Sequence, residues 1–283
     1  MSLQLTNIKK RIKSVTGAYK VTSAMKLVST VRLRKYRSKM LSNKNYIEEM
    51  DKVVDDVLSR LDKKIETPFN QENINATKNL YVIISSTLGL CGSYNNNVFR
   101  MSESKIKEED DAIILGKKGI LYFKNQKFGK IEGFDDYSNY SNEKIIKKLV
   151  NLVNKAYENK EYREIHLIYT EYKNSIAFIP RDYLLLPIRY ERDEEKANDE
   201  KIILEPSQEE LVNTLIPIYL NGVIHSKLLE SEVCEQAARC NAMDSAVNNA
   251  KDILDSLQIE FNKARQASIT QEITEIVGAS NSK

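Results

Sequence analysis

The proline residues of this 283-residue chain are missing from both of its ends, and this distribution constrains the fold more than any other feature. All five prolines lie between positions 68 and 217. Residues 1–67 contain one glycine and residues 218–283 contain two. Because proline and glycine break helices and mark turns, each end can form one very long helix, whereas the middle of the chain must turn often.

Apolar residues of the N-terminal segment recur at the spacing of one helix face. A helix of about 55–60 residues would be about 80–90 Å long, at ~1.5 Å per residue. This length exceeds the diameter of a compact domain, so we expect the helix to project. The stripe begins with Ile8, Ile12, Val15, Tyr19, Thr22 and Met25 and continues more loosely through Val28, Val31, Tyr36, Met40, Ile47, Met50, Val54, Val57 and Leu61.

The C-terminal segment has a stricter repeat, with alternating steps of three and four residues. Its positions are Cys240, Met243, Val247, Ala250, Leu254, Leu257, Phe261, Ala264, Ser268 and Gln271. A sustained period of 3.5 residues predicts a left-handed coiled coil. Since a helix with a narrow apolar stripe is not stable alone in water, we expect the two ends to pack as an antiparallel pair. The alternative is dimerisation through two separate coiled coils.

Charge favours the pairing of the two ends. Residues 1–47 contain twelve Lys or Arg and no acid, whereas residues 230–283 contain nine acids and five bases. Exposed ion pairs contribute only ~0–1 kcal/mol each, so this is supporting evidence. A basic block is also typical of proteins that bind nucleic acid, anionic lipid or an acidic partner. A nucleic-acid-binding coiled coil is therefore the alternative function, and it predicts binding that falls steeply with salt.

The middle of the chain alternates short apolar runs with helical patterns. This alternation predicts a mainly parallel, Rossmann-like sheet with helices on its faces. Strands are predicted at 80–85, 111–115, 165–170 and 183–188, the last at a sheet edge because it contains Pro187. Helices are predicted at 95–107, 117–125 and 141–160. The predicted fold class is α/β, with a coiled-coil helix at 1–67, the α/β domain at 76–205 and a second coiled-coil helix at 207–283.

The predicted loops lack a phosphate-binding motif. The sequence at 89–92 is only Gly-x-x-Gly, and Gly116 with Lys117 lacks the upstream glycine of a P-loop. Cys91 has no histidine expected within reach, and His166 falls inside a strand, where a structural role is expected. We therefore expect no catalytic site and no cofactor. A nucleotide-dependent enzyme is a further alternative, which predicts that the isolated chain binds nucleotide.

Composition excludes several other classes. Two histidines and three widely spaced cysteines do not suit a zinc site or a disulfide framework, so no metal is expected. The longest apolar runs, such as 81–84, are far shorter than the ~20 residues of a membrane helix. No signal or transit peptide precedes the first patterned segment, and this favours a bacterial protein.

Several segments together resemble the gamma subunit of F-type ATP synthases. They are residues 8–15, 20–28, 89–95, 235–244 and 261–272, of which the two C-terminal segments are the most specific. The resemblance covers the whole chain in order. This sequence departs from the family pattern at Thr87 and Leu88, where an acid and a base are common, and at Cys240 and Val247, where methionine and threonine are common.

The resemblance implies a non-catalytic rotor shaft. The helix pair would lie inside a hexameric ring of alpha and beta subunits, and the α/β domain would contact the epsilon subunit and the c ring. Ion flow would turn the c ring together with the shaft, which would bias the catalytic beta subunits in sequence during ATP synthesis or hydrolysis. The protein would be peripheral, on the cytoplasmic side of the cell membrane.

The resemblance also implies contact residues on the two helices. Arg265, Gln266 and Thr270 would contact a loop of a beta subunit, and Met25 with Lys26 would lie opposite them on the N-terminal helix. A basic shaft face would suit acidic loops of the beta subunits. Its members are Arg32, Arg34, Lys35, Arg37 and Lys39.

Overall fold

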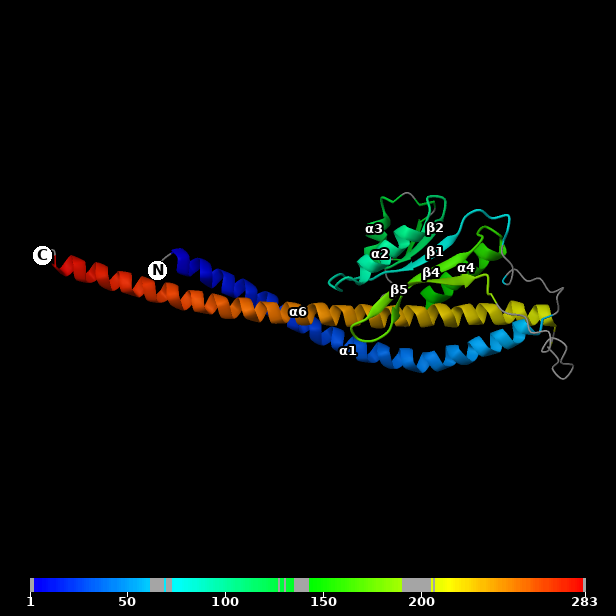
Figure 1. Cartoon of the computed structure of the whole chain (residues 1–283), viewed down its shortest axis with the longest axis horizontal. Coiled ribbons are helices and arrows are strands. Elements are labelled where there is room, and N and C mark those ends of the chain that lie inside the picture. The colour runs from blue at the N-terminus through cyan, green and yellow to red at the C-terminus, as the bar shows by residue number, and fades with distance from the viewer. Residues whose placement is uncertain are drawn as a thin grey trace. The chain divides into compact units, whose positions relative to one another are not determined.

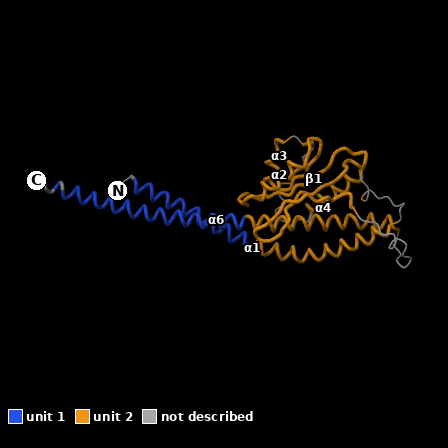
Figure 2. Tube along the Cα trace, in the orientation of Figure 1, with its two compact units in different colours: residues 1–31, 239–283 blue, residues 32–238 orange. Residues whose placement is uncertain are grey.

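Two compact units make up the chain (Figure 2). The computed structural model describes residues 3–61, 69, 73–126, 128–129, 131–134, 143–189, 205 and 207–281. Unit 1 comprises Met1–Val31 and Arg239–Lys283, and unit 2 comprises Arg32–Ala238. Two long helices contribute to both units, α1 (Leu3–Ser59) and α6 (Gln208–Asn281) (Figure 1).

Both long helices have nearly the predicted lengths. Helix α1 has 57 residues and ends at Ser59, and residues 62–67 of the predicted N-terminal helix lie outside the described residues. Helix α6 has 74 residues and continues through Pro217. Proline removes one backbone donor from a helix interior, so the packing of α6 must compensate for the lost hydrogen bond.

Unit 1 is an antiparallel pair of helices. Lys26 of α1 forms an ion pair with Asp244 of α6. Four residues further along α1, the Thr30 hydroxyl lies 3.3 Å from the Cys240 thiol, four residues back along α6. Near the other end, the Lys9 ammonium lies 5.7 Å from the centre of the Phe261 ring. The opposite progression along the two helices confirms the predicted antiparallel arrangement.

The predicted seam of α6 is the buried side of the helix in unit 1. Met243, Val247 and Leu257 are buried, at 4%, 7% and 4% exposure. Further on, Ser268 is half-buried and Gln271 is exposed. The seam therefore ends where the sequence turns polar.

The predicted stripe of α1 is partly wrong. Val28 and Val31 are exposed by 52% and 61%, whereas Ser29 is buried. The inward positions continue at helical spacing from Thr22 through Ser29 to Leu33. The prediction followed apolar side chains, whereas the helix period and a small hydroxyl residue determine which position turns inward.

Unit 2 contains a five-stranded sheet in the order β3-β2-β1-β4-β5. Strands β1 to β4 are parallel, and β5 pairs antiparallel with β4. The strands are β1 (Leu80–Ile84), β2 (Asp111–Leu115), β3 (Ile131–Phe134), β4 (Ile165–Tyr172) and β5 (Phe178–Leu186). The prediction of a mainly parallel sheet between long terminal helices is confirmed.

Two strands differ from the prediction. Strand β3 was not predicted, because it has four residues including Gly133 and presents little pattern. Strand β5 begins five residues earlier than the predicted strand, and Pro187 follows it rather than lying within it. Pro180 lies inside β5 instead, opposite Thr170. It occupies the edge strand, where proline is tolerated.

Helices cover both faces of the sheet (Figure 1). Helices α2 (Tyr94–Lys105) and α3 (Lys117–Phe123) lie on one face, and α4 (Glu143–Glu158) and α6 lie on the other. Because alternate strand residues point to opposite faces, β1 contributes to both cores. Val82 packs in the α4 and α6 core, whereas Ile83 packs in the α2 and α3 core.

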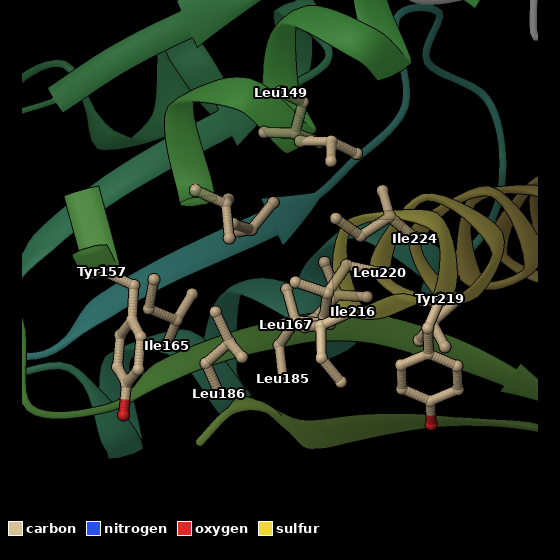
Figure 3. Packing of buried hydrophobic residues seen from close by; sticks show 14 of the residues in the cluster. Leu149, Tyr157, Ile165, Leu167, Leu185, Leu186, Ile216, Tyr219, Leu220 and Ile224 are labelled. Carbon is tan, nitrogen blue, oxygen red and sulfur yellow. The ribbon is translucent and has the colours of Figure 1, made fainter. Parts of the chain in front are cut away.

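The larger core joins α6 to the sheet (Figure 3). It contains Leu167 of β4, Leu149 of α4, and Ile216, Leu220 and Ile224 of α6, all of them fully buried. Burying apolar surface contributes roughly 25 cal/mol per Å². The first third of α6 is therefore part of the folded core of unit 2.

Candidate functional site

The glycine-containing turn after β1 is organised around a buried thiol. The Asn95 side-chain amide donates to the Ser86 hydroxyl at 2.7 Å and to the Cys91 sulfur at 3.3 Å. Cys91 is only 2% exposed. Gly92 has φ +57°, a left-handed conformation that favours glycine. This turn is a structural connection, as predicted, and it holds Cys91 as an internal packing and hydrogen-bonding group.

Gly116 marks a second close approach in the same region. Its φ is +97°, and a Cβ there would lie 2.2 Å from the Ser85 carbonyl oxygen. The Ser85 hydroxyl accepts a hydrogen bond from the Gly119 backbone at 2.9 Å. The Ser85 side chain, directly after β1, therefore occupies the space at the start of α3. In a phosphate-binding loop the backbone N–H groups at this place would be open to a ligand.

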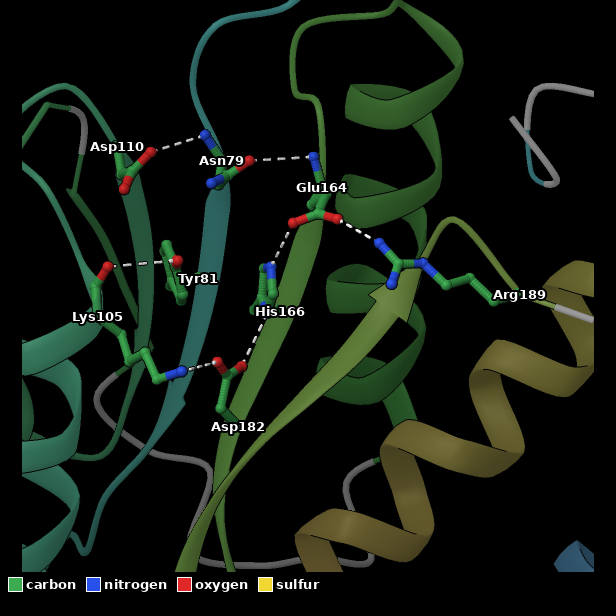
Figure 4. A network of polar contacts seen from close by, with 8 residues as sticks. All are labelled: Asn79, Tyr81, Lys105, Asp110, Glu164, His166, Asp182 and Arg189. Carbon is green, nitrogen blue, oxygen red and sulfur yellow. Dashed lines mark hydrogen bonds and ion pairs between the residues drawn. The ribbon is translucent and has the colours of Figure 1, made fainter. Parts of the chain in front are cut away.

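His166 lies in a network of charged side chains on the α2 face of the sheet (Figure 4). Its Nδ1 is 2.8 Å from Asp182 Oδ1 and its Nε2 is 3.1 Å from Glu164 Oε2. The Lys105 ammonium lies 3.4 Å from Asp182. Arg189 donates to Glu164 at 2.9 Å. These contacts tie β4, β5 and the end of α2 together.

The network changes the proton affinity of two members. Burial alone would lower the pKa of His166, but the hydrogen bonds and charges of Asp182 and Glu164 outweigh it and raise that pKa. Burial would raise the pKa of Asp182, but His166 and Lys105 outweigh it and lower that pKa. The sequence prediction placed His166 at a structural position but did not find Glu164 and Asp182 as its partners, because their neighbourhood depends on strand register.

Cavities in unit 2 are modest. The one between α1, α4 and α6 has a volume of about 350 Å³ and is lined by Asn43, Lys147, Asn221 and His225 among others. Over the part of the chain that the structure describes, no group of three or more His, Cys, Asp or Glu side chains could hold a metal ion. The contact residues predicted from the sequence lie instead on α1 and α6.

The predicted contact residues of α6 lie on its surface. Arg265, Gln266 and Thr270 are all exposed. Gln266 and Thr270 are four residues apart and share a helix face, whereas Arg265 points about a quarter turn away. A row of exposed apolar residues accompanies them near the C-terminal end of α6. The row consists of Ile269, Ile273, Ile276 and Val277, which are 48–69% exposed.

Met25 and Lys26 do not lie opposite Arg265. Both are half-buried, and Lys26 pairs with Asp244. That pairing places Lys26 on the order of 30 Å along the helix from Arg265, at ~1.5 Å per residue. The expected juxtaposition is wrong, because the register of the pair is set by the seam and not by the motif positions.

The five predicted basic residues are all exposed, but they do not form one face. Helical spacing groups Arg32 with Lys35 and Lys39 on one flank of the inward stripe. Arg34 and Arg37 lie on the other flank. The basic region therefore surrounds α1 on both sides of its buried stripe.

Solved central stalks have the fold of this chain. A structure of Euglena gracilis mitochondrial ATP synthase, described as OSCP/F1/c-ring, aligns with a TM-score of 0.70 over 98% of this chain and 94% of the other, at 16% identity. The central stalk and c-ring structure of Tetrahymena thermophila ATP synthase aligns with a TM-score of 0.58 over 80% and 99%, at 22% identity. These likenesses define the fold class as that of an ATP synthase central stalk.

Sequence comparison identifies the family. A family model described as ATP synthase matches residues 4–282. The ATP synthase gamma chain of Mycoplasma capricolum is 34% identical over 279 residues, covering 99% of each chain. That of Clostridium botulinum is 35% identical over 285 residues, covering 100% of this chain and 99% of the relative. The chain therefore belongs to the ATP synthase gamma-chain family, and the nucleic-acid-binding alternative has no support from these relatives.

No described helix is both long enough and apolar enough to cross a membrane.

Proposed function

We propose that this chain is the central rotor shaft of an F-type ATP synthase. The observation that carries the proposal is the antiparallel pairing of α1 and α6 in unit 1, in a chain of the gamma family. Neither helix is stable alone, and together they form a rod of two antiparallel helices. Such a rod transmits force to neighbouring proteins through its surface and performs no bond chemistry.

The shaft acts by differential contact. A ring of alpha and beta subunits surrounds the helix pair, and each catalytic beta subunit meets a different side of it. A ligand or partner shifts a conformational equilibrium only as far as its contact free energies with the two states differ. Rotation of an asymmetric surface therefore biases the beta subunits one after another between states of different nucleotide affinity.

The end of α6 is the part of the shaft that enters the ring most deeply. The exposed apolar row, from Ile269 to Val277, suits an apolar sleeve formed by the ring. Arg265, Gln266 and Thr270 contact a loop of a beta subunit. Met25 and Lys26 contact the ring at a separate level, since Lys26 lies beside Asp244.

The basic residues of α1 form a second contact region. Arg32, Lys35 and Lys39 on one flank and Arg34 and Arg37 on the other face acidic loops of beta subunits. Their exposure leaves the charged groups accessible. An approach from either flank meets positive charge, which suits a shaft that turns past successive partners.

The sheet of unit 2, residues 76–205, is the part of the rotor that binds the epsilon subunit and the c ring. Helices α1 (Leu3–Ser59) and α6 (Gln208–Asn281), within the predicted segments 1–67 and 207–283, form the shaft. The solved Euglena and Tetrahymena assemblies that share this fold include a c ring in their descriptions. The protein is held peripherally at the cytoplasmic side of the cell membrane, through the complex.

Reconstitution tests the proposal. The chain is mixed with the alpha and beta subunits of the same organism, and ATP hydrolysis is measured together with the composition of the purified complex. We expect the three proteins to elute together with ATPase activity, and the isolated chain to hydrolyse nothing. Activity of the isolated chain, or an active alpha–beta complex that excludes it, would contradict the proposal.

A further inference from the structure

One stretch of α6 is enclosed on every side of the helix. Each residue from 231 to 238 is buried, and the most exposed of them is Glu235 at 6%. We call residues 231–238 the enclosed segment. Helices at a domain surface normally bury one face only. Several polar side chains are buried here, so the segment is not a simple apolar core helix. They are Ser231, Glu232, Glu235 and Gln236.

The edge of β4 binds this segment through its backbone. Pairing of β4 with β1 is recorded up to Ile168, and the next residues of β4 pair with β5 alone. Beyond that point the Thr170 backbone amide donates to the Ser231 hydroxyl at 3.1 Å. The Tyr172 amide donates to Glu230 Oε1 at 2.9 Å. Beyond the end of the β1 pairing, side chains of α6 therefore accept the hydrogen bonds of β4 backbone amides.

A third contact completes the strand edge. The Cys234 thiol donates to the Thr170 carbonyl at 3.5 Å. Thr170 therefore uses both its amide and its carbonyl on α6. Its strand partner across β5 is Pro180, which has no amide to donate. The backbone of Thr170 is consequently fixed to the helix more than to the neighbouring strand.

A lysine of α6 is held beside the same strands. The Lys227 ammonium lies 4.8 Å from the centre of the Tyr169 ring and 5.3 Å from that of Tyr183. It also lies 3.7 Å from Glu230 Oε2. The faces of aromatic rings attract a lysine ammonium, most strongly where the lysine is partly desolvated. Lys227 thus holds the Glu230 carboxylate in position for the Tyr172 amide.

Two other elements close the enclosure. Cys91 of the turn after β1 and Tyr94 at the start of α2 form a buried cluster with Cys234 and Ala238. On the α1 side, burial and the hydrogen bond and charge of Glu232 raise the pKa of Tyr36 to about 12. The enclosed segment is therefore held by three parts of unit 2.

These polar contacts do something that the apolar core cannot. Apolar burial is non-directional and depends on area, so it resists separation of α6 from the sheet but permits sliding or turning of the helix. Hydrogen bonds are directional and weaken steeply with misalignment. Buried polar groups are often less stabilising than apolar ones of the same size, and their best-attested use is to fix register.

We propose that Glu230 and Ser231 are positioning residues that lock the axial and rotational register of α6 on the sheet, so that torque passes between unit 2 and the shaft helix without slip. This proposal rests on the shaft function. It adds that the sheet holds the shaft helix at Glu230 and Ser231, through hydrogen bonds from backbone amides of β4. The lock acts at the point of α6 that leads directly into the Arg239–Asn281 part of the same helix.

The test compares two double variants of the same composition. Glu230→Ala with Ser231→Ala removes both acceptors. The control, Ser256→Ala with Glu260→Ala, changes the same residue types at exposed positions of the same helix, where the Ser256 hydroxyl bonds to the Asp252 carbonyl of its own helix. The conservative variant Glu230→Gln keeps an acceptor for the Tyr172 amide.

Two measurements are made on each variant. The reconstituted complex in liposomes gives the membrane potential built up per ATP hydrolysed, with a potential-sensitive dye. Hydrogen exchange of the full chain reports the Thr170 and Tyr172 amides. We expect the double variant to halve the potential per ATP or lower it further, with hydrolysis and chain content retained. We also expect exchange at the two amides to rise about five- to tenfold, the effect of losing one hydrogen bond each. The control and Glu230→Gln should match the native chain.

Each other outcome is decisive. Potential per ATP equal to that of the control overturns the proposal, as does unchanged exchange at both amides. If the double variant does not enter the complex, the same assay is made with Ser231→Ala alone. A membrane potential per ATP equal to that of the control then overturns the proposal. Failure of the shaft function is a different result, because in that case the native chain itself would be absent from an active complex.

Discussion

Helix α6 has two environments along one continuous length. In unit 2 its enclosed segment is buried on every side, and its contacts include the backbone of β4. In unit 1 the same helix buries only a seam against α1, and the apolar row from Ile269 to Val277 is exposed. The difference indicates that one end of the helix is fixed within its own chain, whereas the other end presents its surface to partners.

The two helix pairings also differ in chemistry. Unit 1 uses a narrow seam of Met243, Val247 and Leu257, flanked by the ion pair of Lys26 with Asp244. Unit 2 uses a broad apolar core together with buried polar contacts. A narrow seam keeps a rod slender, and a broad core resists distortion. The folded stability of the chain should therefore reside mainly in unit 2.

The largest expected effect is on unfolding of unit 2. Ile224→Ala removes a fully buried side chain of the core, and such truncations cost about 2–5 kcal/mol. Ile273→Ala removes an exposed one and should cost less than about 0.5 kcal/mol. Urea unfolding of the full chain measures both. Equal destabilisation by the two variants would contradict the difference between the units.

The next effect is on the assembled complex. If Arg265 makes the proposed contact with a beta subunit, Arg265→Ala should lower its ATP hydrolysis about tenfold, since arginine is enriched among the few interface residues that carry most of the binding energy. Lys263→Ala is the matched control, because Lys263 is another exposed cation two residues away on the same helix. ATPase activity at equal chain content measures the effect. An equal loss of ATPase activity in both variants would contradict a specific contact of Arg265 with a beta subunit.

A smaller effect concerns the basic region of α1. Replacing Arg32, Lys35 and Lys39 with glutamate should weaken assembly several-fold at low salt, because like charges would then face acidic loops. The defect should shrink as salt is raised and the Debye length falls to about 8 Å at 0.15 M. Assembly is measured by co-elution across a salt series. The same reversal at Arg34 and Arg37 tests the second flank, and an assembly unaffected by either set would remove this contact region.

The smallest effect is the pH dependence of unit 2. The pKa of His166 is raised in the folded chain, so its protonated form adds stability below the unfolded pKa of about 6.5. That contribution is lost as pH rises through the folded pKa. His166→Gln should therefore flatten the fall in stability that begins as pH rises above the unfolded pKa of about 6.5. Urea unfolding at several pH values measures it, and an unchanged slope in the variant would contradict the role of the network.

In acid the stability of unit 2 depends on pH in the opposite direction, because Asp182 stabilises the fold when it is ionised. The pKa of Asp182 is lowered by His166 and Lys105, against its burial. Its contribution is therefore present above the unfolded carboxyl pKa of about 3.9 and is lost as pH falls through the lower folded pKa. Asp182→Asn should remove that loss of stability in acid.

Periodicity predicted the parts of this molecule that repeat. The seam from Met243 to Leu257 follows directly from spacing, because burial on one side imposes a period, whereas strand β2 is buried at all five positions and was found as a short apolar run. Strand β3 and the inward Ser29 were missed, since a short strand and a small polar residue leave no apolar pattern. The contacts of Thr170 with Ser231 join positions 61 residues apart, and no local rule specifies them.

Rotation of the chain inside its complex tests the account most directly. A probe is attached to an introduced cysteine on unit 2, in a chain whose Cys240 is replaced, and the alpha–beta ring is fixed to a surface. The account predicts that ATP makes the probe turn continuously in one direction, and that rotation stops when ATP is removed. A probe that stays still while the same complexes hydrolyse ATP would contradict the shaft function.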